Sequence, residues 1–214
     1  MTNILYDSLF AHHAGNQAPF LQLDDSRVVS YDAFLKRAAQ VAHVLKNNGV
    51  SPGDRVVVQA PKLLDTIALY AASVQAGAVY LPLNTAYTFA ELEYFISDAQ
   101  PALIVCDSTD ETEIEKLAAR SGARLLTLGG EAPSLSREAD AQPCDFESAE
   151  RAQDDLAALL YTSGTTGRSK GAMLSHRNLL SNAQALVDLW GITNADRLVH
   201  ALPIFHTHGL FVAM

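Results

Sequence analysis

A segment rich in glycine and hydroxyl side chains, residues 162–171, has the composition of a phosphate-binding loop. Glycine opens backbone conformations that are closed to other residues and lets the chain approach a ligand closely. Hydroxyls and free backbone N–H groups can surround phosphate oxygens, and a lysine adds the positive charge that phosphate sites use. The residues that we expect to contact phosphate are Thr162, Ser163, Gly164, Thr165, Thr166, Gly167 and Lys170.

The spacing within this segment differs from that of the Walker A loop, which requires Gly-x-x-x-x-Gly-Lys-Ser/Thr. Here the position five beyond Gly164 is Ser169, and Lys170 is followed by Gly171. A surface turn that binds nothing needs only one or two residues of these types. The sequence therefore favours a phosphate loop of a different class.

Two histidines near the end of the chain, His206 and His208, form a second candidate site. From an extended chain both could face a metal ion, but no third ligand accompanies them, so no metal site is predicted. Each could instead be a histidine that packs or hydrogen-bonds within the core. A role at a substrate pocket is the third interpretation.

The composition argues against several classes of protein. The formal charge is −9, and the 15 lysines and arginines are scattered without a basic run, so nucleic acid is not an expected partner. No apolar stretch reaches the length of a membrane span, and the N-terminus lacks the basic and apolar regions of a signal peptide. The two cysteines lie far apart, and Cys106 falls in an apolar run that reads as a buried strand. We expect a cytoplasmic protein that acts on small molecules and does not contact membranes.

The segments that must position the candidate sites alternate between strand and helix patterns. Strands are expected at 27–30, 55–60, 79–81, 102–106, 123–128 and 155–160, and helices at 31–48, 64–75, 89–99 and 111–121. This alternation predicts an α/β fold of mostly parallel sheets flanked by helices. The glycine-rich segment follows the last of these strands, and the carboxyl ends of strands are where open α/β sheets bind ligands.

Three further expectations concern the remaining segments. Residues 129–154 are rich in glycine, proline, serine and acidic residues, which predicts a solvated connection. Ser175 is expected to cap a helix from His176 to about Leu189, with Trp190 packed in the core at its end. Residues 197–202 read as another strand.

The glycine-rich segment also carries a resemblance to a known family. Residues 161–171, Tyr-Thr-Ser-Gly-Thr-Thr-Gly-Arg-Ser-Lys-Gly, resemble the AMP-binding signature of the adenylate-forming superfamily, which includes acyl-CoA synthetases, luciferases and peptide-synthetase adenylation domains. Segments that resemble the first core motif, the second core motif and the acyl-pocket motif follow in the expected order at 29–34, 75–84 and 201–210. Within the superfamily, the chain is most similar to malonyl-CoA synthetases in residues 81–88, 167–176 and 200–211.

The resemblance implies an ATP-dependent, AMP-forming acid–CoA ligase. A carboxylate would attack the α-phosphorus of ATP bound with Mg²⁺, diphosphate would leave, and coenzyme A would then displace AMP from the acyl-adenylate. The resemblance implies catalytic roles for Lys170, Thr166 and His206, with His206 at the wall of the acyl pocket and His208 as its neighbour. A second carboxylate, as in malonate, would need an arginine or a hydroxyl cluster, for which the chain offers no evident candidate.

The resemblance also implies that residues 1–214 are the truncated N-terminal part of the AMP-binding domain, without the C-terminal lid domain. The adenine and ribose motifs, the hinge, the lid lysine and the Mg²⁺ ligand would lie beyond Met214. We therefore expect this piece to be inactive by itself and to self-associate through the unpaired sheet edge and the apolar surface left uncovered, as a dimer that buries them. Two alternatives stay open: a ligase for another short acid, and a non-catalytic nucleotide-binding or assembly module.

Overall fold

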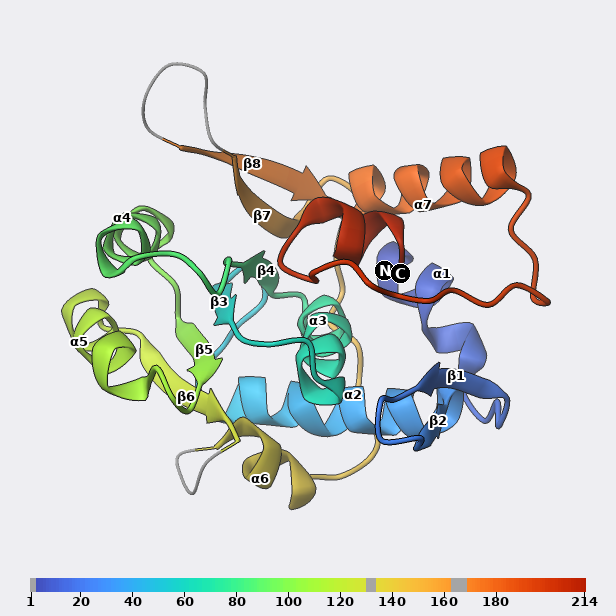
Figure 1. The fold of residues 1–214 in the computed structure, drawn as a ribbon, viewed down its shortest axis with the longest axis horizontal. Helices are drawn as coiled ribbons and strands as arrows, with labels where there is room; N and C mark the ends of the chain where they lie inside the picture. The colour runs from blue at the N-terminus through green and yellow to red at the C-terminus, as the bar shows by residue number, and fades with distance from the viewer. Residues whose placement is uncertain (1–2, 130–133, 163–168) are drawn as a thin grey trace.

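The computed structural model describes residues 3–129, 134–162 and 169–214, in which helices and strands alternate along most of the chain (Figure 1). The strands are β1 (Pro19–Gln22), β2 (Val28–Ser30), β3 (Arg55–Gln59), β4 (Val79–Pro82), β5 (Leu103–Asp107), β6 (Arg124–Leu128), β7 (Leu156–Thr162) and β8 (Lys170–Ser175). The helices are α1 (Ile4–Leu9), η1 (Ala11–His13), α2 (Tyr31–Asn47), α3 (Leu64–Ala76), α4 (Phe89–Ala99), α5 (Glu111–Ser121), α6 (Leu135–Asp140), α7 (His176–Trp190) and the π-helical turn η2 (His208–Val212).

A six-stranded sheet in the order β6-β5-β3-β4-β7-β8 forms the centre of the molecule. The strands from β6 to β7 run parallel, and β8 pairs antiparallel with β7 at one edge. β1 and β2 form a separate two-stranded sheet. The predicted α/β fold with a mostly parallel sheet and flanking helices is therefore confirmed.

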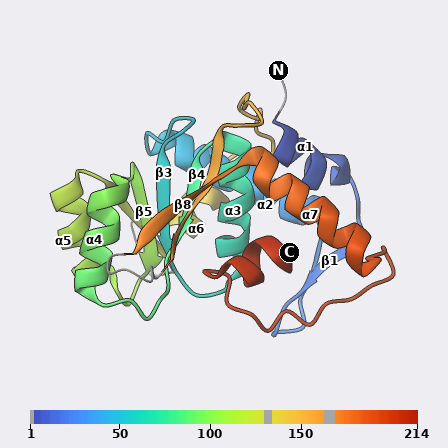
Figure 2. The ribbon, with the colours of Figure 1, turned by 90° about the horizontal axis from the view of Figure 1, so that it is seen from above.

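Successive side chains of a strand point to opposite faces of the sheet, so alternate residues pack into two separate cores. In β3, Val56 and Val58 belong to the core beneath α2 and α3, whereas Val57 belongs to the core beneath α4 and α5. Figure 2 shows α4 and α5 on one side of the sheet and α2 and α3 on the other. The central strands are buried on both faces, which explains their continuous apolar sequences.

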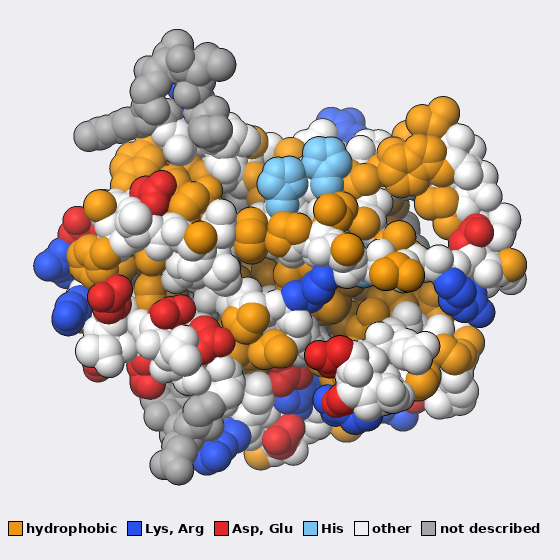
Figure 3. Space-filling model, viewed as in Figure 1, with side chains coloured by type: hydrophobic (Ala, Val, Ile, Leu, Met, Phe, Trp, Pro, Cys, Tyr) orange, Lys and Arg blue, Asp and Glu red, His pale blue; other side chains and the backbone are white. Residues whose placement is uncertain are grey.

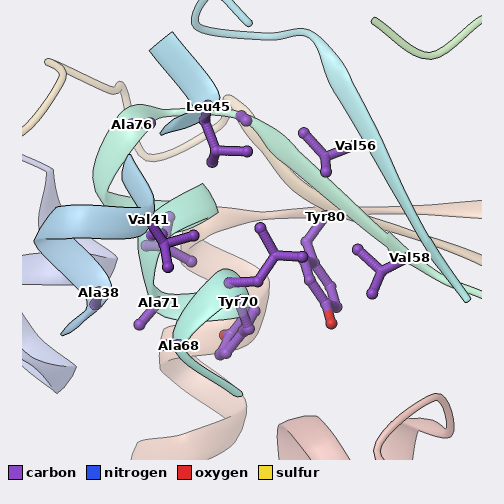
Figure 4. Packing of buried hydrophobic residues seen from close by; sticks show 14 of the residues in the cluster. Ala38, Val41, Leu45, Val56, Val58, Ala68, Tyr70, Ala71, Ala76 and Tyr80 are labelled. Carbon is purple, nitrogen blue, oxygen red and sulfur yellow. The ribbon is translucent and has the colours of Figure 1, made fainter. Parts of the chain in front are cut away.

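Small and large side chains interlock in the core beneath α2 and α3 (Figure 4). The contributors labelled there are Ala38, Val41 and Leu45 from α2, Ala68, Tyr70, Ala71 and Ala76 from α3, and Val56, Val58 and Tyr80 from the sheet. Alanines on both helices let α2 and α3 lie close together against the sheet.

The predicted helix starts are confirmed by their caps. Thr88 and Ser175 each form a capping box, Thr88 with Glu91 and Ser175 with Asn178. The predicted burial of Cys106 is also confirmed, and desolvation raises the pKa of its thiol to about 12. Within the described ranges, no helix combines the length and the apolar character that a membrane crossing needs.

The connection between β6 and β7 is more structured than predicted. It contains α6, whose Leu135 and Ala139 are buried against the rest of the core. The prediction of a wholly solvated connection is wrong there, because two apolar residues in a six-residue helix give too weak a periodic signal to detect.

The C-terminal quarter differs from its prediction in three ways. Residues 197–202 form no strand, and Val199 is 91% exposed. Trp190 is 57% exposed and does not pack in the core. β8 was not predicted, because its glycine and small residues give little strand signal. A short apolar run becomes a strand only where another strand can pair with it; β8 finds that partner in β7, whereas residues 197–202 pair with none of the described strands.

Candidate functional site

The glycine-rich segment connects two antiparallel strands. β7 ends at Thr162, β8 begins at Lys170, and these two residues are partners in the strand register. The hydroxyl of Thr162 donates to the carbonyl oxygen of Lys170 at 3.5 Å, and both side chains are exposed. The first and the last of the predicted phosphate contacts therefore lie side by side at the carboxyl end of a sheet strand. The others, Ser163, Gly164, Thr165, Thr166 and Gly167, lie outside the described residues.

Helix α4 holds both strands at the point where the segment begins and ends. The hydroxyl of Tyr94 donates to the carbonyl oxygen of Ser169 at 2.9 Å. On the other strand, the hydroxyl of Tyr161 donates to a carboxylate oxygen of Asp98 at 2.5 Å, and its ring lies 4.4 Å from that of Phe95. Burial, together with the hydrogen bond to Asp98, raises the pKa of Tyr161, so the phenol keeps the proton that it donates.

Gly171 permits the close pairing of the two strands beside this clamp. A Cβ atom at this position would lie 3.0 Å from the side chain of Leu159 and 3.5 Å from the ring of Tyr161. The first distance is tight, so the Leu159 side chain would have to shift by a few tenths of an ångström, whereas the second is an ordinary van der Waals contact. The glycine that the family signature places here thus has a steric reason in this structure.

The second candidate site lies on residues 200–209, here called the histidine loop. Ile204 is buried near its middle, and Leu210 is buried just after it. At its end, a Cβ atom on Gly209 would lie only 2.1 Å from the carbonyl oxygen of Pro203, so only glycine lets the chain close at this point. The backbone N–H of His206 donates to the same Pro203 carbonyl oxygen at 3.3 Å. The loop is therefore a compact turn with anchored ends.

The two predicted histidines lie together on the surface of this loop. Their rings are nearly parallel, with 17° between the planes and 5.2 Å between the centroids. Both side chains are exposed, and Figure 3 shows pale-blue histidine side chains next to each other on the face turned toward the viewer. The interpretation of either as a buried core histidine is therefore wrong.

A backbone contact determines the hydrogen-bonding role of His206. The N–H of His208 donates to Nδ1 of His206 at 3.3 Å, and Nδ1 of His208 lies 3.4 Å from the same atom. Since Nδ1 of His206 accepts, the proton of its neutral ring lies on Nε2. His206 therefore offers an N–H donor to a ligand, which suits a carboxylate oxygen.

The structure shows the phosphate segment and the histidine pair as two groups. Among the described residues, no hydrogen bond or ion pair joins either histidine to Thr162 or Lys170. The same part of the chain contains no cluster of three or more His, Cys, Asp or Glu side chains able to hold a metal ion.

Sequence reasoning missed the residues that hold both groups in place. Tyr94 and Asp98 contact partners that are more than 60 residues away in the sequence, and nothing local distinguishes them from other residues of an amphipathic helix. Lys62 and His200 play a similar part at the histidine loop. Lys62 gave one detectable signal: it closely follows a buried strand, at the edge where ligands bind in such sheets.

Comparison with known proteins places this geometry in a family. The AMP-binding enzyme family matches residues 10–214. The chain is 30% identical over 185 residues to an oxalate–CoA ligase of Arabidopsis thaliana and 29% identical over 210 residues to a malonate–CoA ligase of the same plant. It covers 36% and 34% of these relatives, which in turn match 84% and 94% of the chain.

Among solved structures, the ATP-bound MatB of Rhodopseudomonas palustris is similar over 100% of the chain, with a TM-score of 0.94 and 49% identity. The chain covers 42% of that protein. It therefore spans about a third of the length of the two plant ligases and less than half of MatB. The match over nearly all its residues shows that this chain belongs to the AMP-binding enzyme family.

Proposed function

We propose that residues 1–214 are the N-terminal part of the AMP-binding domain of an acid–CoA ligase that consumes ATP, forms AMP and acts on malonate. The observation that carries the reaction class is the β7–β8 hairpin. It bears the family signature, pairs Thr162 with Lys170, and is held on both strands by α4. A lid domain and coenzyme A would complete the reaction, in keeping with the resemblance.

The hairpin would serve the first step, in which a carboxylate oxygen attacks the α-phosphorus of ATP and diphosphate leaves. Negative charge moves onto phosphate oxygens during this step, so the site must supply preorganised donors rather than a proton shuttle. Lys170 would supply an ammonium group, and Thr162 and Thr166 would supply hydroxyls. Because α4 fixes the two strand ends, these donors would need little reorganisation as the charge moves.

The histidine loop would hold the acid. His206 would donate Nε2–H to one oxygen of the reacting carboxylate and so orient the other oxygen toward phosphorus. His208 would support this role indirectly, because its backbone N–H fixes the proton position on the His206 ring. Mg²⁺ would neutralise phosphate charge when bound. No role of a described residue in this proposal depends on it.

The choice of malonate rests on similarity. A relative named for malonate aligns with 94% of the chain. MatB is 49% identical to the chain over the aligned residues. A ligase for another short acid is the second candidate, because an oxalate–CoA ligase is equally similar in sequence, at 30% identity. Measurements on the full-length protein would distinguish the two.

The first prediction tests the phosphate segment in the full-length protein. Lys170→Ala and Thr166→Val should each lower ATP–diphosphate exchange, with Lys170→Ala losing about 10²-fold, because a transition-state donor is removed. Thermal unfolding should be unchanged, since Lys170 is exposed. Lys116→Ala, on the exposed surface of α5, is the matched control and should exchange at the wild-type rate. Wild-type exchange in both site variants would remove the hairpin from the mechanism.

The second prediction tests the acid. A panel of acids supplied with ATP and coenzyme A should give the highest kcat/KM with malonate, above oxalate, acetate and medium-chain acids. Thioester formation measured for each acid gives this ranking directly. If oxalate or an aromatic acid leads by a wide margin, the malonate assignment is wrong, while the ligase assignment stands.

A further inference from the structure

Lys62 lies in the turn between β3 and α3, where the electrostatics of the helix disfavour a positive charge. The turn is closed by a hydrogen bond from the hydroxyl of Thr66 to the carbonyl oxygen of Pro61 at 2.7 Å. Lys62 directly precedes Leu63, the N-cap of α3. The N-terminus of a helix carries a partial positive charge, which disfavours a neighbouring cation. The free N–H groups at this end of α3 offer the ammonium group no acceptor.

The acceptors of the Lys62 ammonium group all belong to the histidine loop, 138 residues or more along the chain. Nζ of Lys62 donates to the carbonyl oxygen of His200 at 2.6 Å and to that of Leu202 at 3.1 Å. It also lies 3.3 Å from Nδ1 of His200. An ammonium group has three N–H donors, and each of them has an acceptor here. Although Lys62 is exposed, its hydrogen-bonding capacity is used within the protein rather than kept for a substrate carboxylate.

His200 extends this contact to the far end of the loop. Its Nε2 lies 2.7 Å from the carbonyl oxygen of Gly209. A carbonyl can only accept, so Nε2 must carry the proton, and an ammonium can only donate, so Nδ1 must be bare. One neutral tautomer satisfies both contacts. The Gly209 carbonyl and the Lys62 ammonium therefore favour the same form of His200, and together they tie the two ends of the histidine loop.

We propose that Lys62 is a positioning residue, which acts through His200 to hold the histidine loop in the shape that presents His206. His206 lies between the two tied ends, and its backbone N–H reaches the Pro203 carbonyl within the same turn. Without the ammonium group, the carbonyls of His200 and Leu202 lose their donor, and only the Gly209 carbonyl still favours one tautomer of His200, so that preference becomes weaker. The consequence for catalysis rests on the proposed function, whereas the structural consequence does not.

The structural part is tested by NMR on the 214-residue chain with Lys62→Met, which keeps the length of the side chain but removes the donors. At alkaline pH, where histidine is neutral, long-range ¹H–¹⁵N spectra distinguish Nε2–H from Nδ1–H. Wild type should show His200 as Nε2–H alone, and Lys62→Met should show both forms together with shifted amide signals of His206 and Gly209. Lys116→Met is the matched control and should leave these signals unchanged. An unaltered His200 spectrum in Lys62→Met would overturn the proposal.

The catalytic part is tested by exchange kinetics on the full-length protein. Lys62→Met should raise KM for the acid about tenfold and leave KM for ATP unchanged, because the histidine loop is displaced while the hairpin is not. The factor should be the same for malonate and for the monocarboxylate propionate. Lys62→Gln, which retains an N–H donor, should give a smaller rise. An effect confined to malonate would mean that Lys62 binds the second carboxylate, and would overturn the positioning role. A wild-type protein with no exchange on any acid would refute the proposed function, and the NMR result would still decide the role of Lys62.

Discussion

Helices α3 and α7 are similar in length and rich in apolar residues, yet they have opposite surroundings. In α3, 11 of the 13 residues are buried, because the helix lies between the sheet and α2. In α7, which has 15 residues, only His176 and Leu179 are buried. Figure 2 shows α7 along the outside of the molecule, next to α1. Apolar content thus predicted both helices, but it did not predict which of them would be covered.

The apolar residues that α7 leaves exposed continue into the segment that follows it. The exposed apolar side chains of this region are those of Val187, Leu189, Trp190, Ile192, Leu198 and Val199. Where such side chains gather on a protein surface, they mark sites of contact with other parts of a protein or with a second molecule. The comparison therefore separates a region whose packing is complete from one whose apolar side chains still face solvent.

The largest effect expected is on the stability of the buried helix. Leu69→Ala in α3 removes a fully buried side chain and should lower the free energy of unfolding by about 2–5 kcal/mol. Leu189→Ala in α7 makes the same chemical change at a side chain that is 77% exposed, and should stay within about 0.5 kcal/mol of wild type. Denaturant unfolding of both variants, at a concentration where the chain sediments as a monomer, measures the difference. Equal losses would show that α7 is covered in solution and would remove the contrast.

An intermediate effect is expected at the buried start of α7. The His176 ring is buried, and among the described residues neither of its nitrogens has a hydrogen-bond partner. Arg151 and Asp155 are the charged groups that influence it. Burial, helped by the positive charge of Arg151, lowers its pKa from 6.5 to about 4, against a smaller opposing effect of Asp155.

The sign of the pH dependence follows from this shift. Between about pH 6.5 and about pH 4 the unfolded chain binds a proton on His176 that the folded chain does not, so the contribution to stability is lost as pH falls. The slope from this group should approach about 1.4 kcal/mol per pH unit. His176→Phe should flatten the pH dependence by that amount, measured by urea unfolding at several pH values. Above pH 7 histidine is neutral in both states, so the difference between variant and wild type should become constant there. A variant with the wild-type slope would mean that His176 is protonated equally in both states.

Substitutions at the exposed apolar side chains of α7 and the segment after it should change the free energy of unfolding least, but should change self-association strongly. We expect the 214-residue chain to self-associate through these side chains. We also expect it to lack ATP–diphosphate exchange with malonate by itself. Trp190→Ser with Val199→Ser should shift the chain toward monomer in sedimentation experiments, with little change in unfolding. Lys116→Ser, on the far helix α5, is the control and should sediment as wild type does. A wild-type monomer with measurable exchange would contradict both the association and the need for further domains.

Much of the fold was determined by the sequence over short distances. The strand and helix alternation, the capping box of Thr88 with Glu91 and the apolar run around Cys106 all depend on residues within about one turn or one strand of each other. The signature segment identified the family for the same reason, because its glycines, hydroxyls and lysine are contiguous. Such features need no knowledge of what packs against them.

Only the tertiary structure decided how the candidate sites are held. Which surfaces meet in the folded chain decides that β8 pairs with β7, that His176 is buried and that residues 197–202 form no strand. The contact of Tyr94 with Ser169 spans 75 residues, and that of Lys62 with His200 spans 138. Even the proton position on His206 follows from the closed shape of the loop around Gly209. The sequence supplies the donors and acceptors, but contacts between residues this far apart form only once the sheet and its helices have packed, because no local spacing links the partners.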